Sequence, residues 1–345
     1  MKAAVLVSTN KIEIIDREIP KPKKGEVQVK VHTVAICGTD VHIFQGYSIG
    51  AFHPKLPLVL GHELSGTVTA LGDGVTKIHI GERCVVEANI GCGRCELCRK
   101  GSYCFCNNVQ VISIHCDGGF SEYMVVPEDK VYPIPDTYSW EPAALTEPLA
   151  MAMLTFLDCS VTPRDYVAAL GCGMGGFALA ALARMSGAEK VIMTGTRDER
   201  LLVGKKVGAD ITINAKREDV INRVLEETKG QGADVVYEAA GVPETVIQTV
   251  KVARKTGKIG IYGVPVKPVD GFDFGEFLCK ALKLISASGS PRAFPNAISV
   301  ASSGKVDLKP VITHRFRFED IQKAMEIVRD RKDGVIKALV KVGKE

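Results

Sequence analysis

The chain has 345 residues, too many for one small binding module and enough for two domains of roughly 150 residues each. Hydrophobic residues make up 46% of the chain and charged residues 24%, a composition that excludes global disorder. The 44 Lys and Arg against 40 Asp and Glu leave a net charge of +4, which is too small for a dedicated nucleic-acid-binding protein.

The N-terminal half is predicted to be a compact β domain. Val27 to Val31 alternates apolar and polar residues with period two, which is typical of a half-buried strand. Turn residues separate it from its neighbours, for example at Gly72 to Gly74. Further strands are expected at Met1 to Val7, Lys11 to Ile15, Ser65 to Leu71, Arg83 to Val86 and Phe120 to Val126.

Neither a signal peptide nor a membrane span is expected. The apolar run Ala3 to Val7 is shorter than the ~7 to 15 residues of a signal peptide. The longest uncharged stretch, Tyr166 to Ala183, is interrupted by glycines and a turn signal. We therefore expect a cytoplasmic protein that binds no membrane and no nucleic acid.

Four of the eleven cysteines predict a structural zinc site. In a chain of this size without an export signal, clustered cysteines favour metal binding over disulfides. Cys92, Cys95, Cys98 and Cys106 can surround one tetrahedral zinc ion and leave no open position, so this site should hold a loop and do no chemistry. Cys104 could take the place of Cys106 as the fourth ligand.

Other potential metal ligands are scattered along the chain: Cys37, the pair His62 and Glu63, and Glu147. Their spacing alone does not define a site, and each could simply be packed in a core. A thiolate, an imidazole and a carboxylate with an exchangeable fourth position would, however, form a catalytic zinc site that binds and acidifies a substrate oxygen.

From about residue 160 to 285 predicted strands alternate with helices, which indicates a parallel sheet with helices on both faces and a doubly wound, nucleotide-binding fold. Strands are expected at Tyr166 to Leu170, Lys190 to Thr194, Asp234 to Glu238 and Lys258 to Tyr262. Helices are expected at Phe177 to Met185, from after Thr194 to about Val207, at Val220 to Thr228 and at Thr245 to Val252. The tail, with a helix near Phe318 to Arg329 and a strand near Val335 to Val342, does not extend this pattern and could fold back onto the β domain.

A glycine fingerprint follows the first of these strands. Gly171, Gly173 and Gly176 satisfy the G-x-G-x-x-G pattern of dinucleotide-binding turns. The first permits a tight turn, the second lets a pyrophosphate approach the backbone, and the third lets the helix pack close to the strand. The helix N-terminus then presents unpaired N–H groups to the phosphates.

The second strand predicts a preference for NADP over NAD. NAD-binding proteins place an acidic residue at its end, where the carboxylate accepts from the ribose 2′-hydroxyl. This chain has Gly195, Thr196 and Arg197 there, which offer space, a hydroxyl donor and a cation to a 2′-phosphate. Asp198 and Glu199 follow directly, so a strand ending one or two residues later would restore a carboxylate and allow NAD.

Over nearly its whole length the sequence resembles the zinc-dependent medium-chain dehydrogenases. The resemblance is carried by CGTDVH at Cys37 to His42, GHE at Gly61 to Glu63, the four-cysteine segment, TEPLA at Thr146 to Ala150, the glycine fingerprint and KPVITHRF at Lys309 to Phe316. The segment Gly46 to Glu63 and Glu147 are most similar to polyol (sorbitol-type) dehydrogenases, and CGTDVHIF and PVITHRF are equally similar to threonine dehydrogenases. The Arg-Tyr pair with which sorbitol-type enzymes contact their polyol has no match in Ser288 to Arg292, which argues against sorbitol itself.

This resemblance implies an α/β fold, with a GroES-like β domain plus a doubly wound parallel-sheet Rossmann domain. The GroES-like domain would span residues 1–155 with its zinc lobe at about 90–108, the Rossmann domain 156–289, and the segment 290–345 would return to the GroES-like domain. It also implies two zinc ions, one catalytic and one structural, and a homodimer or homotetramer.

The same resemblance implies roles for particular residues. Cys37 and His62 would ligate the catalytic zinc, and Glu63 and Glu147 would complete its sphere directly or through water. Thr39 matches the hydroxyl that takes the substrate proton, and His42 the residue that passes it towards solvent. The run from Gly195 to Arg197 is similar to that of NADP-using bacterial alcohol dehydrogenases.

We therefore expect reversible hydride transfer between NADP and a secondary alcohol, such as a polyol, sugar alcohol, cyclitol or amino sugar. One alternative is an L-threonine 3-dehydrogenase-like enzyme. Another is a cofactor-binding quinone reductase or redox sensor without zinc chemistry, which Cys37, His62 and Glu63 together disfavour. A zinc-stabilised nucleic-acid-binding protein is disfavoured by the charge and the phosphate-binding turn.

Overall fold

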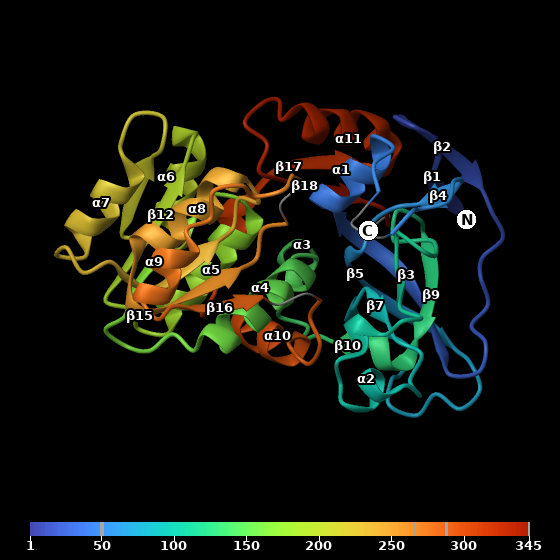
Figure 1. Ribbon diagram of the computed structural model, residues 1–345. Coiled ribbons are helices and arrows are strands. Elements are labelled where there is room, and N and C mark those ends of the chain that lie inside the picture. Colours follow the sequence, from blue (N-terminus) through green and yellow to red (C-terminus); the bar gives the residue numbers. More distant parts are fainter. Residues whose placement is uncertain (49–51, 265–266, 287–288, 344–345) are drawn as a thin grey trace. The chain divides into compact units, whose positions relative to one another are not determined.

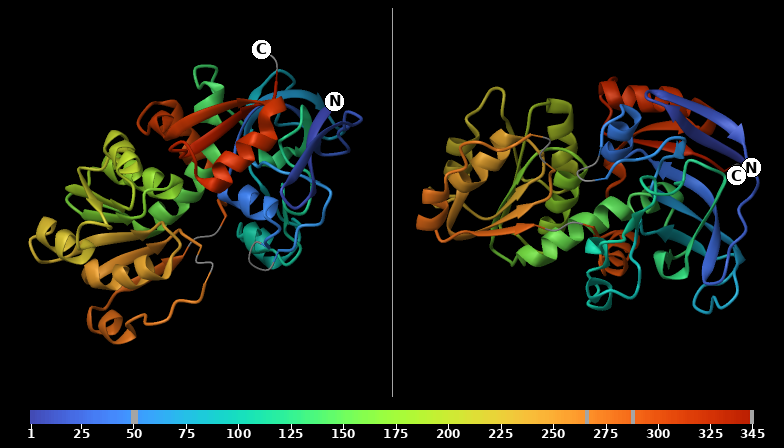
Figure 2. Two further views of the ribbon diagram at one scale, coloured as in Figure 1. Left: turned by 90° about the horizontal axis from the view of Figure 1, so that it is seen from above. Right: turned by 45° about the vertical axis from the view of Figure 1, so that its right-hand side comes forward.

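The structure is a computed structural model that describes residues 1–48, 52–264, 267–286 and 289–343 (Figures 1 and 2). The chain forms two compact units. Unit 1 comprises Met1–Glu147, Gly289–Ser302 and Ile312–Glu345, and unit 2 comprises Pro148–Ser288 and Ser303–Val311. Ser288, at the start of the stretch compared with sorbitol-type enzymes, lies outside the described residues.

Unit 1 is built mainly from β-strands, as its alternating sequence predicts. Its strands are β1 (Lys2–Ser8), β2 (Lys11–Asp16), β3 (Glu26–Ala35), β4 (Leu58–Val59), β5 (Glu63–Leu71), β6 (Arg83–Val86), β7 (Asn89–Ile90), β8 (Gln110–Val111), β9 (Tyr123–Pro127), β10 (Val131–Pro133), β17 (Ile312–Arg317) and β18 (Lys337–Lys341). Its helices are α1 (Gly38–Phe44), α2 (Glu96–Arg99), α3 (Trp140–Ala143), α10 (Phe294–Ser302) and α11 (Ile321–Asp330), with 3₁₀ turns at Tyr103–Phe105, Glu128–Lys130 and Phe318–Asp320.

The central strand of unit 1 is β3, which pairs antiparallel with β5, β9 and β18. Val27, Val29 and Val31 of this strand are fully buried, in agreement with their period-two spacing. The pairing with β18 brings the C-terminal tail back to the N-terminal strands, and α11, red in Figure 1, lies beside the blue β2. The tail therefore belongs to the β-rich unit.

Unit 2 contains one parallel sheet in the order β13-β12-β11-β14-β15-β16. Its strands are β11 (Tyr166–Leu170), β12 (Lys190–Gly195), β13 (Ile211–Asn214), β14 (Ala233–Glu238), β15 (Ala253–Ile261) and β16 (Lys283–Ser286). Its helices are α5 (Met174–Met185), α6 (Asp198–Val207), α7 (Val220–Glu227), α8 (Pro243–Val252) and α9 (Phe274–Cys279), with a 3₁₀ turn at Lys309–Val311; α4 (Thr146–Cys159) leads into the unit.

The strand order of unit 2 reverses direction at β11, which places helices on both faces of the sheet. From β11 the chain moves through α5 and α6 to β13, and α7 then carries it back to β14. Right-handed crossovers that run in opposite directions place α5 and α6 on one face and α7 and α8 on the other. The predicted doubly wound fold is confirmed, and the edge strands β13 and β16 are additions that the sequence analysis did not identify.

The core of unit 2 consists of apolar side chains from the sheet and from the helices that cover it, such as Leu170, Ile192, Val224, Val250 and Ile259. Each of these side chains is fully buried. In the part of the chain that the structure describes, no helix is long and apolar enough to cross a membrane.

Candidate active site and metal centres

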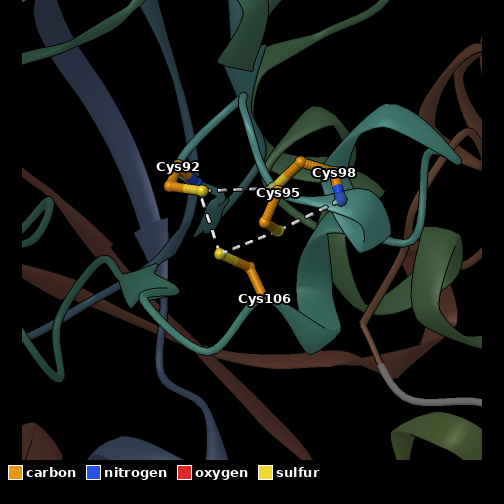
Figure 3. A group of neighbouring side chains, drawn as sticks. All are labelled: Cys92, Cys95, Cys98 and Cys106. Carbon is orange, nitrogen blue, oxygen red and sulfur yellow. Dashed lines mark hydrogen bonds between the residues drawn. The ribbon is translucent and has the colours of Figure 1, made fainter.

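The four predicted cysteines of the loop between β7 and β8 lie together (Figure 3). The ligand atoms of Cys92, Cys95, Cys98 and Cys106 are all within 4.8 Å of one another, with 4.0 Å between the sulfurs of Cys92 and Cys98 and 3.7 Å between those of Cys95 and Cys106. Four sulfurs at about 2.3 Å from one tetrahedral zinc would be roughly 3.8 Å apart. A disulfide would need about 2.05 Å. The donor set therefore fits a closed zinc site.

Backbone N–H groups lie close to the sulfurs of this group, and burial opposes their effect at Cys98. N–H groups of Arg94 and Cys95 lower the pKa of Cys92 to about 6, while burial raises that of Cys98 to about 12. The backbone N–H groups of Cys98 and Asn108 point at the sulfurs of Cys95 and Cys106, at 3.5 and 3.3 Å. We call residues 92–106 with these four sulfurs the zinc lobe.

Cys104 does not join this group. An ideal Cβ placed on Gly289 would lie 2.4 Å from its sulfur, so Cys104 packs against that glycine. Burial raises the pKa of Cys104 to about 12. Of the two candidates for the fourth position, the geometry selects Cys106.

The zinc lobe is tied to the sheet of unit 1 through the buried carboxylate of Glu87. The Tyr103 hydroxyl donates to both of its oxygens at 2.7 and 2.8 Å, and the Tyr132 hydroxyl of β10 donates to one at 2.9 Å. The ammonium of Lys130 lies 3.6 Å from the centre of the Tyr103 ring. These contacts fix the lobe by hydrogen bonds that are independent of the metal ligands.

A second group joins Cys37, His62 and Glu63, whose ligand atoms also lie within 4.8 Å of one another. Strand pairing brings them together: Ala35 at the end of β3 is directly opposite Glu63 at the start of β5. Cys37 follows β3 as the N-terminal cap of α1, and His62 immediately precedes β5. One thiol, one imidazole and one carboxylate therefore meet at one end of an antiparallel strand pair.

Asp40 and Ser113 fix the backbone and the imidazole ring of this second group through hydrogen bonds. Asp40 is fully buried, and its two oxygens accept from the backbone N–H groups of Cys37 at 2.9 Å and Gly61 at 3.0 Å. The Oγ of Ser113 lies 2.8 Å from Nδ1 of His62, whereas the nearer Asp40 oxygen is 3.7 Å from that nitrogen. Burial acts to lower the pKa of His62, but the neighbouring charges of Cys37 and Asp40 outweigh it and raise the pKa well above 6.5.

Two further buried charges surround the second group. The ammonium of Lys337, on β18, donates to both oxygens of Glu63 at 2.9 and 2.7 Å and to the carbonyl of Ile36 at 3.2 Å. Glu147 is 7% exposed and close enough to interact electrostatically with His62 and Glu63, but it is not among the three clustered ligands. Burial raises its pKa to about 7. A thiol, an imidazole and a carboxylate whose ligand atoms lie this close together form a donor set that fits a divalent cation such as zinc.

Thr39 and His42 both lie on α1, three residues apart and therefore on one face of the helix. Both side chains are half-buried. The His42 ring meets the exposed Tyr47 ring edge-on, with 6.4 Å between their centres. The helix that begins at Cys37 thus carries the two residues that the resemblance links to proton transfer.

The glycine fingerprint adopts the geometry that its three positions predict. Gly171 has φ +129°, and an ideal Cβ on it would lie 2.7 Å from the carbonyl carbon of Ala239; a Cβ on Gly176 would lie 1.9 Å from the carbonyl oxygen of Gly171. A Cβ on Gly173 would meet no atom within 4 Å. Gly173 caps the 12-residue helix α5, so open space lies at a helix N-terminus, which fits a pyrophosphate.

The end of β12 is tightly packed at Gly195. A Cβ on Gly195 would lie 2.2 Å from the sulfur of Cys172 in the fingerprint turn. Asp198, the nearest following acid, is bound by the Arg217 guanidinium at 2.7 and 2.5 Å and by the amide of Asn214 at 2.7 Å. Within the described ranges no carboxylate forms an ion pair with Arg197.

Asp40, Ser113 and Lys337 also contact the second group and were not predicted from the sequence as parts of it. Asp40 lies inside the CGTDVH segment and could have been considered on that ground. Lys337 lies in the predicted strand Val335 to Val342, and no prediction was made for the residues around Ser113. Only the tertiary structure brings these two residues to Glu63 and His62.

The family models that match this chain are "Alcohol dehydrogenase GroES-like domain" over residues 23–136 and "Zinc-binding dehydrogenase" over residues 173–303. An L-threonine 3-dehydrogenase of Pyrococcus horikoshii is 35% identical over 95% of both chains. A sorbitol dehydrogenase of Bacillus subtilis is 33% identical over 99% of this chain and 97% of its own.

Solved structures give the same result. A zinc-binding dehydrogenase of Sinorhizobium meliloti bound to NADP has a TM-score of 0.91 at 32% identity, covering 99% of this chain and 98% of its own. An Escherichia coli alcohol dehydrogenase complexed with NADH has a TM-score of 0.92 at 32% identity, covering 99% of both chains.

The chain therefore belongs to the zinc-binding dehydrogenases that carry an alcohol dehydrogenase GroES-like domain, which confirms the expected family. Unit 2 is the Rossmann part of this fold, and the chain is an oxidoreductase. Within the family it is similar to the polyol and threonine dehydrogenases.

Proposed function

We propose that this enzyme transfers hydride reversibly between a secondary alcohol and NADP, with unit 1 binding the substrate and unit 2 the cofactor. The observation that supports this most strongly is the meeting of Cys37, His62 and Glu63 in a member of the zinc-binding dehydrogenases. Unlike the zinc lobe, these three residues leave a fourth tetrahedral position for a substrate oxygen.

Cys37, His62 and Glu63 would hold the catalytic zinc, with Glu147 as the second carboxylate of the site. When bound, the metal supplies Lewis-acid polarisation of the substrate oxygen, and the dinucleotide supplies the hydride acceptor. Lys337 offsets the charge of Glu63 and keeps both carboxylate oxygens in fixed positions. A carboxylate in place of a second thiolate gives a harder, oxygen-rich site that suits substrates with several hydroxyl groups.

Thr39 and His42 would carry the proton. In alcohol oxidation the Thr39 hydroxyl accepts the substrate proton and passes its own to His42, which lies one helical turn further on. In ketone reduction the same residues act in reverse. Replacing Thr39 by Val should lower kcat about 100-fold and leave the zinc content at two ions per chain.

The structure around Gly195 supports NADP. A 2′-phosphate would find no free carboxylate at the end of β12, because Gly195 has no side chain and Asp198 is bound to Arg217. Arg197 and Thr196 remain to bind it. The matched comparison is Arg197→Ala against wild type with both cofactors: kcat/KM for NADP should fall about 10- to 100-fold, while that for NAD stays unchanged. Equal or better use of NAD by the wild type would overturn the proposal.

The experiment that tests the function as a whole measures NADPH formation with polyols, inositols, amino sugars, secondary diols and L-threonine. L-threonine belongs in this series because relatives at 35% identity are L-threonine 3-dehydrogenases. We expect turnover of a polar secondary alcohol that is lost on removal of the second zinc. A metal content of one zinc per chain, with no alcohol oxidised, would instead favour a quinone reductase or redox sensor.

We also propose that the chain forms a homodimer or homotetramer through the β16 edge of the unit 2 sheet. The supporting observation is the exposure of Leu284 on β16, at 50%, and of Phe274 and Leu278 on α9, the helix that precedes β16 in the chain, at 69% and 77%. Sedimentation equilibrium should show a dimer or tetramer. The Leu278→Lys substitution should shift the association equilibrium towards smaller species. A wild-type monomer at micromolar concentration would contradict this.

A further inference from the structure

Ser113 has a backbone conformation that is unfavourable for serine. Its φ is +68°, in the left-handed region where a residue with a Cβ is strained. The surrounding turn imposes this conformation: Ser113 donates its N–H to the carbonyl of Cys116 at 2.9 Å, and the N–H groups of Ile114 and His115 both donate to the carbonyl of Val111. Glycine would adopt the same φ without strain, so the presence of serine at this position calls for an explanation.

The contact between the side chain of Ser113 and His62 provides this explanation. The side chain is fully buried, and its Oγ lies 2.8 Å from Nδ1 of the buried His62. Among the described residues this hydroxyl is the hydrogen-bond partner of that nitrogen. The nearest Asp40 oxygen is 3.7 Å away, and both Asp40 oxygens already accept backbone N–H groups.

We propose that Ser113 is a positioning residue for the catalytic metal site, and that its strain is retained for this purpose. The hydrogen bond at Nδ1 turns the other ring nitrogen, Nε2, towards Cys37 and Glu63. It also selects the tautomer in which Nδ1 carries the proton and donates it to Ser113 Oγ, so that the lone pair on Nε2 is available to a cation. This inference depends on the metal site proposed above.

The test compares two substitutions that both remove the hydroxyl. Ser113→Ala keeps a Cβ at the strained φ, whereas Ser113→Gly relieves it. Ser160→Gly is the matched control, because Ser160 also has a positive φ, +49°, but is exposed and lies in unit 2. The affinity for the second zinc is measured by competition with a chromophoric chelator, and thermal unfolding is measured at one fixed zinc concentration.

We expect both Ser113 variants to bind the second zinc about 10- to 100-fold more weakly than wild type, by equal factors. Ser113→Gly should unfold at a higher temperature than Ser113→Ala, and Ser160→Gly should bind zinc as wild type does. If the role of Ser113 were purely structural, zinc affinity would follow stability. Ser113→Gly would then bind the second zinc more tightly than Ser113→Ala, and that result would overturn the proposal.

The outcomes also separate this inference from the proposed function. If wild type binds two zinc ions and the Ser113 variants bind both with unchanged affinity, only the role of Ser113 is wrong. If wild type binds one zinc ion, the catalytic metal site itself is absent, and the inference is rejected together with the proposed function.

Discussion

The zinc lobe and the group formed by Cys37, His62 and Glu63 are two clusters of potential metal ligands of opposite construction. The lobe takes all four sulfurs from one short loop, and its backbone N–H groups already point at them. The second group takes its ligands from the ends of two paired strands and is held by Asp40, three residues after Cys37, and by Ser113 and Lys337 from two further segments. A closed site whose ligands all come from one loop can stabilise that loop by itself. An open site needs surrounding residues that hold its ligands in place, so that the fourth coordination position stays free.

The largest effect should come from a lobe ligand. Replacing Cys106 by Ser should lower the free energy of unfolding by about 4–5 kcal/mol, because zinc binding to such a site is folding free energy. Urea unfolding and zinc content check this. Cys104→Ser, two residues away and outside the group, is the control and should keep two zinc ions. A similar loss of stability and of zinc in both variants would contradict the assignment of Cys106 as the fourth ligand of the lobe.

Removing a ligand of the second group should affect catalysis far more than stability. We expect His62→Ala to lower kcat/KM at least about 10³-fold, equivalent to about 4 kcal/mol, because the substrate oxygen loses its Lewis acid. The zinc content should fall from two to one, and a chelator should inactivate wild type while one zinc remains bound. If His62→Ala unfolded as readily as Cys106→Ser, the contrast between the two sites would be wrong.

The scaffold behind the second group can be tested at Lys337. Lys337→Met removes the ammonium group that donates to both oxygens of the buried Glu63, which should cost about 3 kcal/mol of stability. The double variant with Glu63→Gln should recover most of this loss. Urea unfolding of the two single variants and the double variant at one zinc concentration provides the measurement. If the losses of stability in the two single variants added up in the double variant, Lys337 and Glu63 would not be a coupled pair.

The smallest effect concerns the attachment of the lobe. Tyr103→Phe and Tyr132→Phe each remove one hydroxyl from the buried Glu87 and should destabilise the protein by about 1–2 kcal/mol. Because Tyr103 belongs to the lobe and Tyr132 to β10, only Tyr103→Phe should also speed zinc release from the lobe. Equal release rates would show that the sulfurs alone hold the metal.

Local patterns predicted a large part of the fold. The period-two run at Val27 to Val31 became the buried face of β3, and the strand, glycine and helix predicted around Gly171 are present as β11, a tight turn and α5. The short edge strands β13 and β16 escaped prediction, because four residues are too few to show a period. Their positions depend on pairing with neighbours rather than on their own sequence.

The candidate site was predictable only in part. Residue types and motifs identified Cys37, His62, Glu63 and Glu147, but they did not show that Lys337 binds both oxygens of Glu63 or that Glu147 stands outside the clustered three. The proposed NADP preference rests on the missing acid at Gly195. The close approach of Cys172 to Gly195 is a consequence of packing between two turns, which the sequence did not indicate.

By itself, the sequence determined those features whose physics is local: the alternation that makes strands, the glycines that permit the tight turn after β11, and the cysteine spacing that surrounds one ion. The tertiary structure alone decided the partners of each buried charge and ring nitrogen. A hydrogen bond between Ser113 and His62, or an ion pair between Lys337 and Glu63, joins residues 51 and 274 positions apart, and only the pairing of distant strands sets such a distance.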